Sequence, residues 1–315
     1  MLSTRQIKRA MAWAVDSPNL LLRQINRFYH TRGFNRSYNP DGVSVMDEDW
    51  DTLVVLDACR YDLFADRYDL PGTLSAVESR AAHTSEFILG NFHERDLADT
   101  VYVTASPILE RGYLHKYDPQ FHAIVNVWDE DGWNDEYNTV MPETMVEYAL
   151  EALAEYPHKR LIVHFMQPHY PFIGSDLELD QETVPDPEEI TTDIWHEMMR
   201  ESASITHEAV LEAYRRNFDL VQPHVRRLLS ELSGKTVVTS DHGNMLGERS
   251  RPVPIREWGH PIGVYTPELV TVPWLEYTSG PRRAVVAEPP ESAETGEDAD
   301  EDVVADRLRQ LGYAE

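Results

Sequence analysis

Three polar side chains in this 315-residue chain have the types and positions needed to bind one divalent metal ion. Asp57 directly follows the apolar run 53–56, and the adjacent pair Asp241 and His242 directly follows the run 237–240. Carboxylate oxygens with an imidazole nitrogen suit zinc or manganese best, whereas magnesium or calcium would use mainly the oxygens. Taken alone, Asp57 is equally well interpreted as the cap of a following helix.

A histidine in a proline-flanked loop is a further candidate. His169 stands in the sequence Pro168-His-Tyr-Pro171, directly after the apolar run 160–165. Proline favours an extended conformation in the residue before it, so this loop should present His169 at the end of the run. A single histidine is more often a hydrogen-bonded structural residue, but its position beside two other polar run ends favours a functional role here.

Five apolar runs predict the strands that position these side chains, and stretches of helical periodicity separate them. The strands are expected at about 53–56, 101–104, 123–127, 160–165 and 235–239, and the helices at about 84–92, 142–156 and 203–232. This alternation predicts an α/β fold, with a mostly parallel central sheet and helices on both faces. In such sheets ligands bind beyond the carboxyl ends of the strands, where the candidate residues stand.

Residues 1–45 are predicted to form a basic amphipathic arm before the main domain, which should span residues 46–278. Within residues 1–36 there is one acid, Asp16, and there are seven bases: Arg5, Lys8, Arg9, Arg23, Arg27, Arg32 and Arg36. Apolar residues at roughly helical spacing predict two short amphipathic helices, divided near Ser17 and Pro18. The arm either docks on an anionic membrane surface or packs on the protein's own acidic body, and packing is the better-supported alternative.

Two acidic segments are expected to lie outside the sheet. Residues 174–200 form a long insertion over the sheet edge that could act as a lid. The tail, residues 279–315, includes a stretch from 286 to 302 with eight acids and no base, which is typical of solvated, disordered chain. A short helix around 303–312 could dock back on the main domain.

The acid excess is the strongest signal in the composition. Asp and Glu number 55 against 28 Lys and Arg, which gives a formal net charge of -27. An excess spread over the whole chain, with only four lysines, is typical of a haloarchaeal protein, because carboxylates hold their hydration while concentrated salt screens their repulsion. The negative field argues against a nucleic-acid partner.

The chain is expected to be cytoplasmic. Cys59 is the single cysteine, so no intramolecular disulfide can form, which fits a reducing compartment. No stretch approaches the roughly 18 consecutive apolar residues of a membrane-spanning helix, and the first residues lack the features of a signal peptide. Docking of the arm on lipid would make the protein membrane-peripheral.

The order of these motifs resembles the alkaline phosphatase superfamily, especially its sulfatase-like and phosphoglycerol- or phosphoethanolamine-transferase-like branches. The resemblance covers roughly residues 50–277. It rests on a strand ending in Asp57, the Pro-His-x-Pro-Phe loop 168–172, the Ser-Asp-His-Gly stretch 240–243 with Leu-Gly-Glu at 246–248, and His260 before Val272-Pro273. It implies an alkaline-phosphatase-like catalytic domain over residues 46–278.

The resemblance also implies a Ser, Thr or formylglycine nucleophile that ligates the metal from the start of a helix. Ser79, Thr84 and Ser85 stand in the corresponding window, and Thr84 is preferred because it just precedes the apolar run of a predicted helix. The positive end of the helix dipole and metal ligation would both lower the pKa of its hydroxyl. Thr84 could equally be the N-cap of that helix, with Glu86 in the first turn, and both roles are compatible.

Two departures from the family pattern shape the expected chemistry. The Cys/Ser-x-Pro-x-Arg motif of formylglycine sulfatases is absent, and Cys59 is interpreted as a small buried residue, which favours phosphoryl chemistry. The Asp-x-x-x-His pair of two-metal members is also absent. The resemblance therefore implies one metal, held by Asp57, Thr84, Asp241 and His242.

Further catalytic roles follow from the same resemblance. His169 and His260 are expected to contact the substrate oxyanion or to complete a weaker second metal site. Arg60 is expected either to reach the same anionic group or to form a surface salt bridge to Asp62 or a neighbouring acid.

The expected activity is that of a metal-dependent hydrolase or transferase acting on a phosphate ester, and less readily on a sulfate ester. The substrate could be a small molecule, a lipid or a glycan ester. The alternatives are a sulfatase, a two-metal phosphomutase or phosphonate-cleaving enzyme, and a non-catalytic protein that binds a metal or an anion on the same fold.

Overall fold

The computed structural model describes residues 18–110, 117–175, 177, 194–199, 205–289 and 301–313. Within these residues, seven strands form one sheet in the order β2-β11-β8-β1-β7-β3-β4. Six of these strands run in the same direction, and β11 runs opposite to them, antiparallel to both β2 and β8. The strands are β1 (Thr52–Leu56), β2 (Thr73–Glu78), β3 (Asp96–Thr104), β4 (Gln120–Asn126), β7 (Arg160–Phe165), β8 (Gly234–Thr239) and β11 (Thr271–Ser279). The predicted mostly parallel sheet is confirmed.

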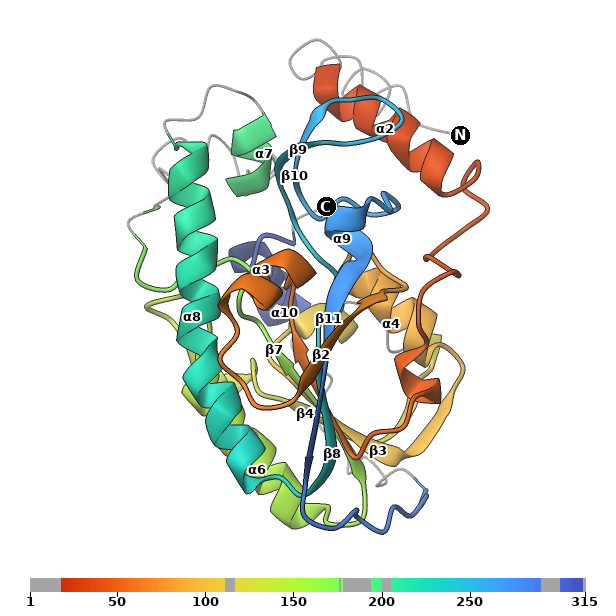
Figure 1. Cartoon of the computed structure of the whole chain (residues 1–315), viewed down its shortest axis with the longest axis vertical. Helices are drawn as coiled ribbons and strands as arrows, with labels where there is room; N and C mark the ends of the chain where they lie inside the picture. Colours follow the sequence, from red (N-terminus) through yellow and green to blue (C-terminus); the bar gives the residue numbers. More distant parts are fainter. Residues whose placement is uncertain are drawn as a thin grey trace.

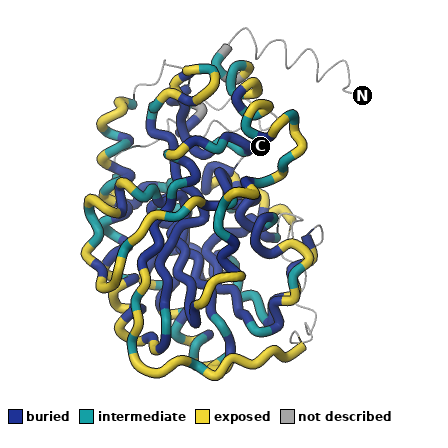
Figure 2. The backbone as a smooth tube through the Cα atoms, turned by 45° about the vertical axis from the view of Figure 1, so that its right-hand side comes forward, coloured by how far each residue is buried: buried dark blue, intermediate teal, exposed yellow. Residues whose placement is uncertain are grey.

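The strand β1 is covered on both faces and paired on both edges. All five of its residues are buried, and Val54 pairs with Val163 of β7 and with Val238 of β8. Figure 2 shows the sheet strands as a largely buried interior. A continuous apolar run is the sequence pattern of such a strand, because neither face meets water.

Helices lie on both sides of the sheet, as predicted. In Figure 1, α6 and α8 lie to the left of the strands and α4 lies to the right. The main-domain helices are α3 (Tyr61–Arg67), α4 (Thr84–Phe92), α6 (Pro142–Glu155), α8 (His207–Glu231) and α9 (Pro267–Val270). The short elements η1 (Val45–Asp47), η2 (Pro107–Leu109), η3 (Glu130–Gly132), β5 (Trp133–Asn134) and β6 (Thr139–Val140) connect them.

The helix α2 (Pro18–His30) packs on a hairpin formed by β9 (Met245–Arg249) and β10 (Arg256–Gly259) (Figure 1). Arg23 forms an ion pair with Glu257, and the Asn26 side chain donates to the Val253 carbonyl at 3.0 Å. This is the second of the two predicted arm helices, and the first lies outside the described residues. No helix in the described part of the chain is long and apolar enough to cross a bilayer.

Part of the acidic insertion is helical. The helix α7 (Ile194–Met199) lies against β10, and Trp195 fills the space beside Gly259, where a Cβ atom would lie 2.7 Å from its ring. The remaining residues of the predicted lid, except 174, 175 and 177, lie outside the described ranges.

The tail returns to the main domain in two places. Residues 286–289 lie in the segment that was expected to be solvated, yet the Val286 amide donates to His158 and the Glu288 amide donates to Ala98. The helix α10 (Glu301–Gln310) agrees with the predicted terminal helix, and it buries Val304 and Leu308.

Candidate metal centre

The side chains of Asp57, Asp241 and His242 meet at the carboxyl ends of the adjacent strands β1 and β8. One ligand atom from each lies within 4.8 Å of the other two, and all three residues are fully buried. Because β1 and β8 are parallel neighbours, residues that directly follow them emerge at the same edge of the sheet.

His242 is held in the tautomer that a metal ligand needs. Its Nδ1 atom lies 2.7 Å from the Gly243 carbonyl, and a carbonyl can only accept, so Nδ1 carries the proton. The unprotonated Nε2 atom then faces the carboxylates, 3.2 Å from Asp241 Oδ2. A backbone carbonyl commonly fixes ligating histidines in this way.

The two carboxylates differ in their hydrogen bonds. Asp241 Oδ1 accepts from the backbone amides of Ala58 at 3.0 Å and His242 at 2.8 Å. Asp57 Oδ2 accepts from the Tyr313 hydroxyl at 2.7 Å, while Oδ1 has no hydrogen-bond partner in the described part of the chain. The site therefore contains a buried carboxylate oxygen that is available to a ligand.

The electrostatics of the site favour a cation. Burial and the charge of Asp241 raise the pKa of Asp57 well above its ordinary value. Burial alone would also raise the pKa of Asp241, but His242, His164 and the Ala58 amide outweigh it and lower that pKa. No Lys or Arg within the described ranges forms an ion pair with either carboxylate. Two acids and an imidazole without a cationic partner fit a divalent metal ion.

Thr84 is the hydroxyl that faces this cluster. It is the first residue of α4, and its Oγ1 atom donates to Asp241 Oδ2 at 2.9 Å and lies 3.3 Å from His242 Nε2. The N-cap of α4 is His83, whose side chain accepts from the Ser85 amide, so the alternative interpretation of Thr84 as the N-cap is wrong.

The two other candidate hydroxyls are engaged elsewhere. Ser85 Oγ lies 2.9 Å from His83 Nδ1, and Ser79 Oγ donates to the backbone carbonyl of Asp241. Of these three hydroxyls, only that of Thr84 contacts the side-chain atoms of Asp241 and His242 that could bind a metal. A nucleophile at this position is also at the N-terminus of a nine-residue helix.

His169 and His260 lie together beside the cluster. Their Nε2 atoms are 2.8 Å apart, and the His260 ring lies 4.8 Å from the His242 ring. His169 Nδ1 contacts the Tyr170 carbonyl and so carries a proton, which makes His260 the donor in the neutral pair. Burial and the three nearby imidazoles lower the pKa of His260 well below its ordinary value.

Arg60 forms salt bridges near the surface, which is the second of the two roles expected for it. Its Nε atom donates to Asp62 at 2.8 Å, and its Nη1 atom forms an ion pair with Glu248 at 2.5 Å. The same side chains line a surface pocket of about 410 Å³. The guanidinium makes no hydrogen bond to Thr84 or to the buried carboxylates within the described residues.

Three residues of the site were missed from the sequence. His164 Nε2 lies 3.7 Å from Asp57 Oδ2, and its polar type within the apolar run 160–165 was the available signal. Burial lowers the pKa of His164 to about 4.

The other two residues are His83 and Tyr313. The His83 ring stacks on the His242 ring with a centroid distance of 6.1 Å, and its position next to Thr84 was the available signal. Tyr313 comes from the tail, where only the apolar spacing of the terminal helix indicated docking.

No family model and no curated protein matches the sequence. Solved structures with a similar fold include the zinc complex of the C-terminal periplasmic domain of EcEptC from Escherichia coli (12% identity, 76% of each chain, TM-score 0.44). They also include BT1596, a 2-O GAG sulfatase (12% identity, 84% of this chain and 71% of that chain, TM-score 0.47).

The integral membrane protein lipooligosaccharide phosphoethanolamine transferase A (EptA) from Neisseria meningitidis is a third similar structure. It shares 14% identity, with a TM-score of 0.42 over 71% of this chain, and this chain spans about half (47%) of its length.

Proposed function

We propose that this protein is a metal-dependent hydrolase or transferase that acts on phosphate esters and uses Thr84 as its nucleophile. The observation that carries the proposal is the hydroxyl of Thr84, buried at a helix N-terminus and 2.9 Å from Asp241 Oδ2. Asp57, Thr84, Asp241 and His242 would hold the metal. A bound divalent cation would offset charge on the ester oxygens and lower the pKa of the hydroxyl, with zinc or manganese the best match to these ligands.

The chain's own residues suit an in-line transfer through a phosphothreonine. A bond forms between Thr84 Oγ1 and phosphorus while the bond from phosphorus to the leaving oxygen breaks. Thr84 loses one proton and the leaving alcohol gains one, so no net proton is consumed. An anionic ester beside His169 and His260 favours their protonated forms, which can donate to the non-bridging oxygens. Water or an acceptor alcohol then releases the phosphoryl group and restores Thr84.

The local structure supports phosphate over sulfate. Thr84 occupies the nucleophile position and cannot be converted to formylglycine. Burial raises the pKa of the Cys59 thiol well above its ordinary value, so this cysteine is a poor nucleophile. The Cys59 amide donates to Ser240 Oγ, next to Asp241, at 2.8 Å, which fits a structural role in the turn after β1.

The test compares turnover of three chromogenic esters, a phosphodiester, a phosphomonoester and a sulfate ester, in concentrated salt with Zn, Mn, Mg or Ca. Thr84→Ala should abolish turnover of the phosphate ester, and Ser85→Ala, its neighbour on α4, should retain most of it. After rapid quenching, intact-mass analysis should find one added phosphoryl group, and peptide fragmentation should locate it on Thr84. Metal binding without turnover of any ester would favour the non-catalytic binding protein.

We further propose that α2 brings this site to an anionic lipid surface, so that the substrate is a lipid or lipid-linked glycan ester. The face of α2 turned away from the hairpin exposes large apolar side chains, and Phe34 continues this face beyond the helix: Leu21 49%, Ile25 50%, Phe28 55%, Tyr29 62% and Phe34 57%. Residues 18–40 contain four arginines and no acid, in a chain of net charge -27. An exposed apolar stripe with basic neighbours is typical of helices that lie in a membrane interface.

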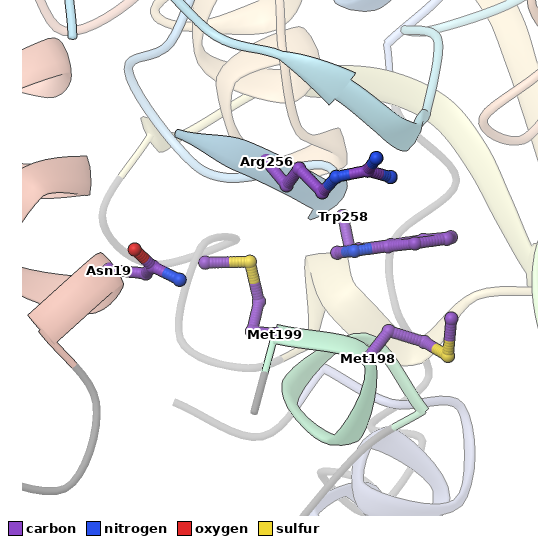
Figure 3. A pocket seen from close by; sticks show the side chains of 5 residues that line it. All are labelled: Asn19, Met198, Met199, Arg256 and Trp258. Carbon is purple, nitrogen blue, oxygen red and sulfur yellow. The ribbon is translucent and has the colours of Figure 1, made fainter. Parts of the chain in front are cut away.

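A separate pocket of about 280 Å³ lies between the start of α2, α7 and the hairpin strand β10. Figure 3 shows the side chains that line it, which are Asn19 of α2, Met198 and Met199 of α7, and Arg256 and Trp258 of β10. Methionine side chains adapt to irregular apolar groups, and an arginine at the rim suits an anionic headgroup.

Sedimentation with vesicles of phosphatidylglycerol and phosphatidylcholine tests this proposal. Replacing Ile25 and Phe28 together by Gln should release the protein from the vesicles, whereas Val285→Gln, an exposed apolar position in the tail, should not. Equal sedimentation of both variants, or unchanged sedimentation after removal of residues 1–36, would contradict the membrane role of α2 and leave the catalytic proposal intact.

A further inference from the structure

The tail residue Tyr313 reaches the candidate metal centre. Its hydroxyl donates to Asp57 Oδ2 at 2.7 Å, across a separation of 256 residues in the sequence, and lies 3.3 Å from Thr84 Oγ1. Only 3% of the residue is exposed. A phenol in this position is in hydrogen-bond contact with a metal-ligand candidate and close to the proposed nucleophile.

The tail holds this phenol in a defined orientation. Leu308 and Leu311 are buried in the main core, and the Tyr313 amide donates to the Leu308 carbonyl at 2.9 Å. The phenol ring stacks on His169 with a centroid distance of 5.0 Å and an interplanar angle of 9°. It also meets the His83 ring edge-on at 5.6 Å. The contacts with His169 and His83 therefore fix the Tyr313 ring on two sides, in the orientation that places its hydroxyl beside Asp57.

The hydrogen bond from Tyr313 leaves the two oxygens of the Asp57 carboxylate in different environments. Oδ2 is occupied by the Tyr313 hydroxyl, while Oδ1 has no partner in the described part of the chain. A carboxylate that is held at one oxygen presents the other to a cation without losing rotational freedom on binding. Outer hydrogen bonds of this kind commonly change metal affinity about 10- to 100-fold.

We infer that Tyr313 is a positioning residue of the metal site, supplied by the C-terminal segment 301–313, and that it orients Asp57 toward the ion. This inference rests on the proposed function. It makes the tail a component of the centre, in contrast to an inhibitory plug, which would occupy the substrate's place and would have to leave before turnover.

The test measures Zn and Mn binding by calorimetry, with thermal unfolding of the metal-free protein as the structural control. Tyr313→Phe keeps the ring and removes the hydroxyl, so metal affinity should fall about 10- to 100-fold while the metal-free melting temperature stays the same. At saturating metal, the variant should regain most of the wild-type turnover. The matched control is Tyr137→Phe, a partly exposed tyrosine between β5 and β6, which should bind metal like the wild type.

Each other result has a distinct meaning. Wild-type protein that binds no metal would overturn the proposed function together with this inference. Wild-type binding with Tyr313→Phe affinity within about twofold of it would overturn the inference alone. Turnover by Tyr313→Phe or Tyr313→Ala above the wild-type rate would also overturn it, because an inhibitory plug would then be the correct description.

Discussion

Two buried aspartates stand at opposite ends of β1, and they have opposite surroundings. Asp51, just before the strand, is 1% exposed, and it accepts from the Lys235 amide at 2.7 Å and from the Arg282 guanidinium. Asp57, just after the strand, is fully buried, and none of the described Lys or Arg side chains forms an ion pair with it. Both aspartates are buried, but Asp51 has a cationic partner, whereas Asp57 has none among the described residues.

The difference separates a structural acid from a ligand candidate. The charge of a buried carboxylate that pairs with an arginine is already neutralised, so this carboxylate is a poor ligand for a metal ion. A buried carboxylate that faces a second one is costly unless it is protonated or a cation joins the pair. Burial of an acid therefore does not by itself distinguish a structural role from a metal-binding role. The absence of a cationic partner among the described residues is what marks Asp57 as a ligand candidate.

The largest expected effect is that of Asp57→Asn. This change removes one charge from the proposed ligand set, so turnover of the phosphate ester should fall about 1000-fold, or about 4 kcal/mol. The melting temperature of the metal-free protein should not fall, because repulsion between Asp57 and Asp241 is relieved. Kinetic assays and thermal unfolding check both parts, and an active variant would remove Asp57 from the metal site.

Metal binding should stabilise the wild-type fold by the next largest amount. At a free metal concentration of 100 times the Kd, the free energy of unfolding should rise by about 2.7 kcal/mol, since the unfolded chain lacks the assembled site. Chelation with EDTA should reverse the gain. Denaturant unfolding with and without metal measures it, and the Asp57→Asn variant, which lacks a complete site, serves as the control.

Asp51→Asn should affect stability and leave the chemistry alone. The amide keeps an acceptor for the Lys235 amide but loses the charge that pairs with Arg282, so the free energy of unfolding should fall by about 2 kcal/mol. Turnover per folded molecule should match the wild type. Loss of metal affinity in this variant would contradict the distinction between the two ends of β1.

The smallest expected effect is that of Asp49→Asn. Asp49 also pairs with Arg282, but its side chain is 70% exposed, so water and salt screen the interaction. The free energy of unfolding should change by at most about 0.5 kcal/mol. A change as large as that of Asp51→Asn would show that the whole Asp49–Arg282–Asp51 network acts as one unit.

The sequence predicted the central part of the fold well. The predicted helix 84–92 has the observed bounds of α4, and the predicted strand 160–165 has those of β7. These elements have strong local patterns, because nearly all residues of α4 and of β7 are buried. The strand β2 was missed because it lies at the sheet edge, mostly exposed, and lacks an apolar run.

The site was predictable where it follows directly from strand ends. Asp57, Asp241 and His242 come together because strand order and direction place them together. The orientation of Arg60 toward Asp62 and Glu248 was an open alternative, since composition does not say which of several neighbouring acids a guanidinium meets. Tyr313 was out of reach, because no local pattern specifies the long-range packing that carries its hydroxyl to Asp57.

The position of β1 in the sheet has a consequence for synthesis. Its two neighbours, β7 and β8, begin at residues 160 and 234, so β1 leaves the ribosome long before either edge can be paired. Until then the apolar segment Thr52–Leu56 presents open backbone groups that other chains can join. Fragments that stop before β8 should accordingly aggregate or require a chaperone, and the whole chain should fold largely after translation has passed residue 239.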